Sequence, residues 1–441
     1  MVIHGTEKIQ AINVPKGSKF KGYIKRIRQE LKISAVNTCY ELESWQTPEG
    51  TYHYAQLPDY LQGTDFGPSL KSYILYQYHQ CHVTQPLLLE QLWELDISIS
   101  SGQLSRIITE GHERFHQEKE DLLTNAKRHS IYLQTDDTGA RHQGYNGYCT
   151  FIGNDLFSFF KSTGLKSRIN FLEILNGQPG YCFNDYAFGY IADRGLSPKY
   201  ITAIDTIKGQ SFTSTEKFLT TLKSLSVSQK YAVKTITEAG LLGHLIDRGM
   251  PESMVILSDD AGQFDVMIHA LCWIHVERNL QKIHTYTNQQ RQELDLLLKA
   301  FWQLYQQLKT YKNNPVDEKK QQIITSFDAI CNWQTKWLAL KKGLDKIKTY
   351  KQELLVVLKY PRVPLHNNQS ESDIREYVKK RKISGSTRSD NGRKARDTFA
   401  SLKKTCRKMN ISFWDYLNDR ITSTHKIKYL PDLLLELTAL N

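Results

Sequence analysis

Three acidic residues in the chain have the types and surroundings of a metal-dependent catalytic site. Asp136 and Asp259 each follow an apolar run that predicts a strand. Glu371 lies in the first turn of a predicted helix that begins after "YPRVPLHNN". If the two strands are neighbours, both aspartates emerge at one edge of a sheet, where the helix could place Glu371 beside them. Three carboxylates in one pocket repel one another strongly unless cations hold them.

Oxygen ligands of this kind suit Mg²⁺ or Mn²⁺. Two such ions about 3.5–4 Å apart can bind the attacking and the leaving oxygens of a phosphodiester displacement. Each residue also has an ordinary structural explanation, because aspartate is common in turns and glutamate in a first helical turn meets the helix dipole. For each residue alone that explanation is the better one, whereas all three beside a basic segment favour catalysis.

A basic segment directly follows the glutamate. Between Arg375 and Lys408 there are thirteen Lys or Arg residues against three Asp or Glu, in a chain of formal net charge +12. Such clustered charge suits a polyanion, and nucleic acid is the commonest one, although a solvated basic face is the plain alternative. The predicted phosphate contacts in this segment are Arg375, Lys379, Lys380, Arg381, Lys382, Arg388, Arg393 and Lys394.

The elements that must position these residues alternate along the chain. Apolar patterns predict strands over 129–137, 144–154, 168–175 and 253–260. Helical patterns occur within 178–250 and cover almost all of 264–360. Asn367 or Asn368 can cap the helix that carries Glu371. The pattern predicts an α/β protein with large helical regions.

The N-terminal part has different patterns. Residues 1–66 are predicted to be rich in strands and turns, with a hairpin around Thr47-Pro48-Glu49-Gly50. Residues 67–127 have helical spacing, and Ser100 with Gln103 forms a predicted capping box. A helix-turn-helix and a simple packed helical hairpin both fit this pattern.

The cysteine pattern and the apolar runs indicate the cellular compartment that we expect for the protein. The seven cysteines are scattered and form no Cys-x-x-Cys pair, which indicates reduced thiols and argues against a disulfide scaffold or a four-cysteine zinc site. No apolar run approaches membrane-spanning length, and the first residues lack a signal core. We therefore expect a cytoplasmic protein with no membrane partner.

Several motifs resemble those of transposases of the insertion sequence sixty-six type. "PLHNNQSESDIREYVKKRKISGS" is similar to the family's block of two asparagines, a glutamate, an arginine and a Gly-Ser pair. "CWIHVERNL" resembles its Cys-Trp-x-His-x-x-Arg signature, and "TDDTGAR" its first aspartate motif. The similarity covers roughly 60–157 and 255–420.

The resemblance implies a DDE transposase with an RNase H-like mixed-sheet core, a large helical insertion and an N-terminal helical DNA-binding region. It assigns Asp136, Asp259 and Glu371 as catalytic carboxylates and metal ligands, with Asp260 as the fallback for the second. Asp137 stands where the family usually has glutamate. Cys272 and His275 match a Cys-x-x-His motif, to which we assign no metal. His275 and Arg278 are expected to lie near DNA or to brace the core.

The implied organisation has five parts. A β-rich region at 1–66 precedes helices at 67–127, and the first part of the core spans 128–272. A helical insertion at 273–360 precedes the completed core at 361–441. The 123 positions between Asp136 and Asp259 exceed the expected spacing, so an extra insertion is predicted near 178–250. The family's cysteine-rich zinc motif is absent from the N-terminal part, where Cys39 stands alone.

The implied reaction is metal-dependent cleavage at element ends followed by strand transfer into target DNA. The expected partners are double-stranded DNA, a second or further copy of the chain, and accessory proteins, in the cytoplasm of a prokaryote at the nucleoid. Two alternatives remain open: an RNase H-like nuclease without strand transfer, and a non-catalytic DNA-binding protein derived from a transposase.

Overall fold

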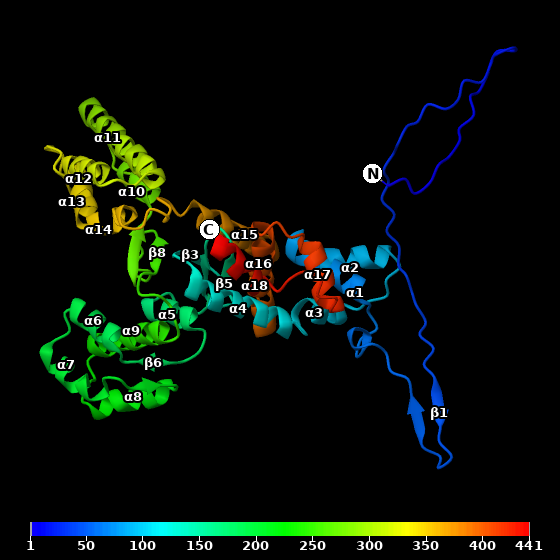
Figure 1. Cartoon of the computed structure of the whole chain (residues 1–441), viewed down its shortest axis with the longest axis horizontal. Coiled ribbons are helices and arrows are strands. Elements are labelled where there is room, and N and C mark those ends of the chain that lie inside the picture. Colours follow the sequence, from blue (N-terminus) through cyan, green and yellow to red (C-terminus); the bar gives the residue numbers. More distant parts are fainter. Residues whose placement is uncertain (1, 441) are drawn as a thin grey trace.

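The computed structural model describes residues 2–440, whose parts follow one another along the long axis of the molecule (Figure 1). A five-stranded sheet and its covering helices lie in the middle. Two lobes project at one end, and three N-terminal helices lie at the other end. The chain is therefore mixed α/β, as predicted.

The central sheet combines antiparallel and parallel pairing. It contains β3 (Tyr132–Gly139), β4 (Tyr148–Gly153), β5 (Ser158–Thr163), β8 (Val255–Ser258) and β9 (Ile268–Leu271). The strand order is β5-β4-β3-β8-β9. The β5–β4 and β4–β3 pairs are antiparallel, whereas the β3–β8 and β8–β9 pairs are parallel. Because parallel neighbours need a crossover, the chain makes a long helical excursion between β5 and β8.

One predicted strand is wrong, and two strands of the central sheet were not predicted. Residues 168–175 form the helix α5 (Arg168–Asn176), because Ser167 caps its first turn by accepting the backbone N–H of Asn170. Gly177 ends α5 in the left-handed region at φ 74°. β5 was not predicted, and β9 interrupts the range expected to be almost wholly helical.

Five helices pack on the sheet or on the helices that cover it. They are α4 (Glu113–His129), α15 (Asn368–Ser384), α16 (Asp390–Lys408), α17 (Phe413–Thr422) and α18 (Leu430–Leu440). α15 packs on β3 and β4, whereas α16 packs on β5 and α4. The main core lies between these layers and includes Leu122, Leu133, Phe159 and Phe399.

Two lobes flank the carboxyl ends of β3 and β8. The first contains α5, α6 (Asp185–Asp193), α7 (Pro198–Ile204), η3 (Asp205–Ile207), α8 (Thr215–Ser224), α9 (Lys230–Asp247) and the paired strands β6 (Tyr181–Cys182) and β7 (Ser211–Phe212). The second contains α10 (Trp273–Gln281), α11 (Asn288–Asn313), α12 (Asp317–Cys331), α13 (Leu338–Thr349), α14 (Lys351–Leu354) and η4 (Val356–Leu358). The second lobe has its own apolar core.

The N-terminal part is less regular than predicted. Residues 2–43 have no helix or strand, so the strands of this part are the hairpin β1 (Ser44–Gln46) and β2 (Tyr52–Tyr54). After η1 (Asp59–Leu61) come α1 (Pro68–Leu75), the π-helix η2 (Tyr76–Gln80), α2 (Gln85–Glu94) and α3 (Ser101–Thr109). The hairpin and the capping box of Ser100 and Gln103 are confirmed. α1, α2 and α3 share a small core.

Within residues 2–440, every helix is too short or too polar to cross a lipid bilayer.

Candidate active site

The strand register brings two of the predicted carboxylates together. β3 and β8 are parallel, and Gln134 pairs with Leu257. Asp136 and Asp259 follow this pair by two residues in each strand direction, so they lie side by side. The sequence predicted that β3 would end at this point, but it continues to Gly139 and pairs with β4. Asp136 is thus fixed within a strand rather than in a turn.

Asp136 and Asp137 point to opposite faces of the sheet because side chains alternate along a strand. Asp136 pairs across the sheet with Phe151, which packs with Ile374 of α15. Burial, together with the negative charges of Asp259, Asp137 and Glu371, raises the pKa of Asp136 to about 7, although the hydrogen bond from the backbone N–H of Asp137 opposes the shift. Of Asp136 and Asp137, it is therefore Asp136 that lies with Glu371 in a half-buried, negatively charged site.

Asp259 and Asp260 have different partners. Asp259 follows β8 directly, and one of its carboxylate oxygens accepts the backbone N–H of Ala261 at 3.1 Å. Asp260 is exposed and forms an ion pair with Lys346 of α13. These contacts favour Asp259 over Asp260 as the partner of Asp136.

Glu371 enters the site from α15 and is surrounded by cations. Its Oε1 accepts a hydrogen bond from Nη1 of Arg278 at 2.8 Å and lies 3.6 Å from Nε2 of His275. Its Oε2 lies 3.5 Å from Nη2 of Arg375, one turn along α15. Asn367 is the N-cap residue, although its side chain makes no capping hydrogen bond. Both His275 and Arg278, predicted near DNA or in the core, thus contact the glutamate.

The Cys-Trp-x-His-x-x-Arg motif links the second lobe to the glutamate helix. The Sγ of Cys272 accepts the backbone N–H of Asn367 at 3.4 Å, just before α15. The backbone N–H of Trp273 donates to Leu365, and its ring fills the core of the lobe. The cysteine and tryptophan therefore hold the start of α15, while the histidine and arginine of the motif face Glu371.

Three residues that brace the site were not predicted from the sequence. Lys166 forms a 2.8 Å ion pair with Asp137, whose other oxygen accepts from Gln263 at 2.8 Å. Arg168 donates to the carbonyl of Gly262 at 2.7 Å and to Asp265 at 3.1 Å. The start of α5 thus holds the loop that follows Asp259.

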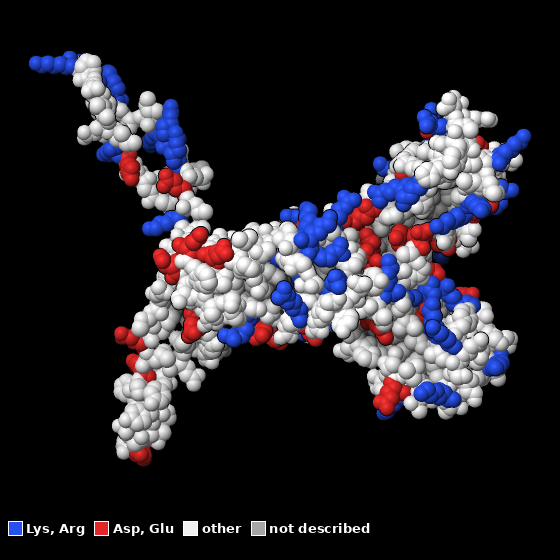
Figure 2. All heavy atoms as spheres, turned by 180° about the vertical axis from the view of Figure 1, so that it is seen from behind, with Lys and Arg blue, Asp and Glu red and all other residues white. Residues whose placement is uncertain are grey.

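The basic residues divide into buried and exposed groups. Lys380 is 5% exposed, and its ammonium donates to the Tyr78 carbonyl, so it is not free for a phosphate and its predicted role is wrong. Arg381 donates to the carbonyl of Gly139, and Arg393 pairs with Asp390 at 2.8 Å. The exposed members are Arg375, Lys379, Lys382, Arg388 and Lys394. Seen from behind, basic side chains gather where α15 crosses the central body (Figure 2).

The three carboxylates do not form a closed metal site in this conformation. Across residues 2–440, no group of three or more His, Cys, Asp or Glu side chains is close enough to hold an ion. Glu371 instead contacts Arg278. The raised pKa of Asp136 and its oxygen-only neighbours nevertheless fit a hard divalent cation.

Two comparisons with known proteins identify the family of the chain. The family model described as Transposase IS66 family matches residues 255–395, which include Asp259 and Glu371. The uncharacterized protein y4jO of Sinorhizobium fredii is 41% identical over 293 residues, covering 66% of this chain and 91% of that protein. On this family match and this extent of similarity, the chain belongs to the transposase IS66 family.

Proposed function

We propose that the chain is a DDE-type DNA transposase that cleaves DNA at element ends and joins the freed 3′ ends to target DNA. The observation that carries the proposal is the register of β3 and β8, which sets Asp136 beside Asp259, with α15 and Glu371 packed on the same face. We further propose that the mixed sheet is an RNase H-like core and that the two lobes are insertions into it.

Asp136, Asp259 and Glu371 would hold two Mg²⁺ or Mn²⁺ ions. When bound, such ions activate an attacking oxygen and stabilise a leaving oxygen of a phosphodiester. The fit rests on the half-buried Asp136, whose neighbouring charges would be compensated by a cation.

Arg278 has a specific part in this proposal. In the described conformation its guanidinium compensates the charge of Glu371. Glu371 would have to exchange this partner before it could reach the aspartates. The exposed residues Arg375, Lys379 and Lys382 lie along the same helix and would hold the phosphate backbone of DNA near the carboxylates. A dimer or larger assembly would then align two DNA ends.

The test is a cleavage assay on DNA with candidate element ends, in Mg²⁺ or Mn²⁺ and in EDTA. We expect metal-dependent cleavage that is reduced at least a hundredfold in Asp136→Asn, Asp259→Asn and Glu371→Gln. Asp260→Asn is the matched control, because it removes an adjacent charge outside the proposed site. Loss of cleavage in Asp260→Asn together with retention in Asp259→Asn would refute our assignment of the second carboxylate.

The products separate the alternatives. Cleavage without joining to target DNA would indicate a nuclease of the same type. Binding of DNA without metal-dependent cleavage by the wild-type chain would indicate a non-catalytic DNA-binding protein and would overturn the proposal.

A further inference from the structure

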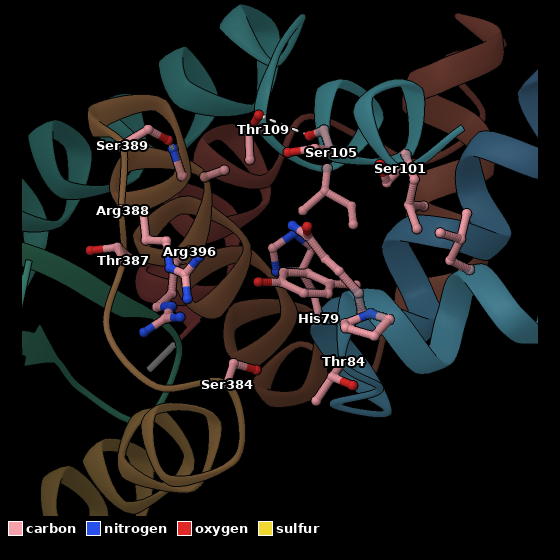
Figure 3. A pocket seen from close by; sticks show the side chains of 18 of the residues that line it. His79, Thr84, Ser101, Ser105, Thr109, Ser384, Thr387, Arg388, Ser389 and Arg396 are labelled. Atoms are coloured by element: carbon pink, nitrogen blue, oxygen red, sulfur yellow. Dashed lines mark hydrogen bonds between the residues drawn. The ribbon is translucent and has the colours of Figure 1, made fainter. Parts of the chain in front are cut away.

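A pocket of about 510 Å³ lies at the far end of α15 from Glu371. One wall comes from α2 and α3, and the other comes from the connection between α15 and α16 (Figure 3). Glu371 lies thirteen residues before Ser384, which corresponds to about 20 Å along an α-helix. The pocket is therefore separate from the candidate active site but on the same helix.

The α15–α16 wall offers donors without partners. Arg396 is 6% exposed, and its Nη1 donates to the carbonyl of Gly385 at 2.9 Å. Its Nε is buried and has no hydrogen-bond partner, and the same holds for the hydroxyl of Ser384. Buried donors are rarely left unsatisfied because the loss of hydration costs about 1–3 kcal/mol. These two groups indicate a ligand with acceptor oxygens.

The start of α16 adds favourable electrostatics to that wall. Ser389 caps this 19-residue helix and accepts the backbone N–H of Gly392. The N-terminus of a helix favours a negatively charged group. Arg388 precedes the cap, and Figure 3 shows it beside Arg396 on one side of the pocket. The carboxylate of Asp390 is compensated by Arg393.

The opposite wall is apolar. Leu89 of α2 and Leu104 and Ile108 of α3 line it, and Pro86 of α2 extends it. Hydroxyl groups of Ser101, Ser105 and Thr109 lie along its edge. A ligand that fills the pocket would therefore have an anionic end and a flat or apolar body. The volume is within the range of small-ligand sites.

We propose that this pocket binds one unpaired nucleotide, with its phosphate toward Arg388 and Arg396 and its base toward Leu104 and Ile108. The nucleotide can be free or can belong to a DNA strand. As a DNA site it rests on the proposed function, since a strand along the exposed basic residues of α15 would reach it. The 20 Å along α15 equal the rise of roughly six base pairs of B-form DNA.

The experiment measures binding to the full-length chain by calorimetry and fluorescence anisotropy. Deoxyadenosine monophosphate and deoxyadenosine test the phosphate requirement, and a duplex with an unpaired tail is compared with a blunt duplex. Arg396→Met removes the buried guanidinium, and Ser105→Phe fills the pocket without a change of charge. Lys217→Ala on α8 is the matched loss of a positive charge elsewhere.

We expect the monophosphate to bind at least tenfold more tightly than deoxyadenosine, and the tailed duplex more tightly than the blunt one. Both differences should disappear in Arg396→Met and Ser105→Phe and persist in Lys217→Ala. Monophosphate binding without a preference for the tailed duplex would support the pocket and overturn its DNA role. Equal binding of monophosphate and deoxyadenosine, or unchanged binding in Ser105→Phe with an unchanged melting temperature, would overturn the proposal. These readouts do not require cleavage, so failure of the proposed function is seen separately.

Discussion

Two carboxylate–guanidinium pairs in this molecule differ in almost every physical respect. Glu118 and Arg420 join α4 to α17, and Glu371 and Arg278 join α15 to α10. The first pair is buried, with side chains 2% and 9% exposed. The second is open, with side chains 15% and 43% exposed. The same chemical groups can thus serve as a fixed support in one place and as an exchangeable contact in another.

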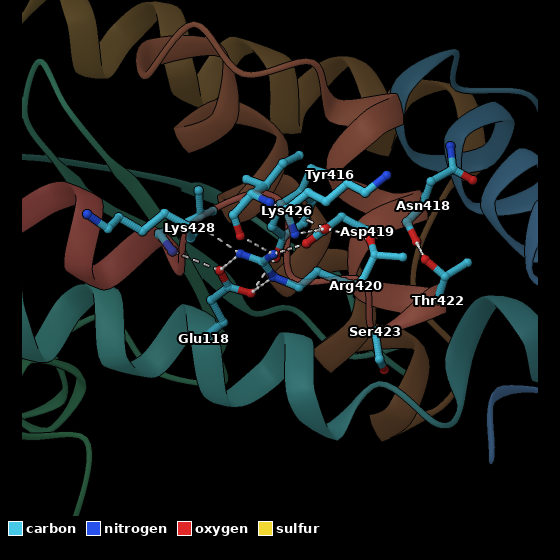
Figure 4. A network of polar contacts seen from close by, with 12 residues as sticks. Glu118, Tyr416, Asn418, Asp419, Arg420, Thr422, Ser423, Lys426 and Lys428 are labelled. Atoms are coloured by element: carbon cyan, nitrogen blue, oxygen red, sulfur yellow. Dashed lines mark hydrogen bonds and ion pairs between the residues drawn. The ribbon is translucent and has the colours of Figure 1, made fainter. Parts of the chain in front are cut away.

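The buried pair is fully hydrogen-bonded (Figure 4). Glu118 accepts from Nε and Nη2 of Arg420, each at 2.9 Å. It also accepts the hydroxyl of Tyr416 at 2.8 Å and the backbone N–H of Leu430 at 3.0 Å. The guanidinium donates further to the carbonyls of Ile427 and Lys428. The network therefore fixes the C-terminal segment against α4.

In the open pair, Glu371 has several cationic partners and can exchange one for another. Arg278 and His275 both approach Oε1 of Glu371, while Arg375 approaches Oε2. Exposed ion pairs contribute little to stability because water screens them. Burial and the number of satisfied hydrogen bonds, rather than the presence of an ion pair, therefore distinguish the structural carboxylate from the candidate functional one.

The largest expected effect is on the buried pair. Glu118→Gln keeps the shape of the side chain but removes one of the two carboxylates that pair with Arg420, the other being that of Asp419. We expect the free energy of unfolding to fall by about 3 kcal/mol or more. Urea denaturation measures it, and Glu371→Gln is the control, with an expected change under about 1 kcal/mol. Equal losses in the two variants would contradict the comparison.

A second prediction concerns pH and the same buried region. His116 of α4 hydrogen-bonds Thr398 at 2.8 Å. Burial, together with the positive charge of Lys394 and contributions from His112 and Lys119, lowers its pKa to about 3, although Glu120 opposes the shift. The unfolded chain therefore binds a proton below pH 6.5 that the folded chain does not. The stability that neutral His116 provides is complete above pH 6.5 and is lost as the pH falls toward 3.

Denaturation between pH 6.5 and 5 measures this effect while most carboxylates remain ionised. The stability of the wild type should fall more steeply than that of His116→Gln, with a difference approaching about 1.4 kcal/mol per pH unit below pH 6. Parallel curves for the two proteins would show that His116 is not held neutral in the folded state.

A third prediction extends the comparison to two lysines of α15. Lys382 is exposed, whereas burial lowers the pKa of Lys380 to about 7, with contributions from Arg396 and Lys403. If Lys382 contacts a phosphate, Lys382→Ala should reduce the slope of log affinity against log salt by about 0.9. Lys380→Met should leave that slope unchanged. DNA-binding titrations at several salt concentrations measure both, and a reduced slope in Lys380→Met would restore the original prediction for that residue.

The smallest expected effect is the coupling within the open pair. A double-mutant cycle of Arg278→Met and Glu371→Gln, followed by urea denaturation, should give a coupling energy of about 0.2–1 kcal/mol. A coupling above about 2 kcal/mol would show that this contact supports the fold, as Glu118 and Arg420 do. In that case Glu371 could not exchange its partner readily.

The failures of the sequence predictions have physical causes. The stretch "RINFLEIL" has apolar residues at spacings that fit either a strand or a helix, and Ser167 and Gly177 decided in favour of α5. Lys380 and Lys382 look alike in a basic run. Only the packing of α15 on Tyr78 and the sheet decides which of them is buried.

The candidate catalytic residues were predictable from the sequence, because acidic residues after apolar runs and a glutamate in a first helical turn beside a basic segment are local patterns. The sequence also identified the motif that joins Cys272 to Arg278. The neighbouring positions of β3 and β8, and the register that sets Asp136 beside Asp259, depend on the tertiary structure. The tertiary structure also places Lys166 and Gln263 against Asp137 and lets Arg278 donate a hydrogen bond to Glu371. These contacts join residues far apart in the chain, and no local pattern encodes which distant side chain a fold will bring to a carboxylate.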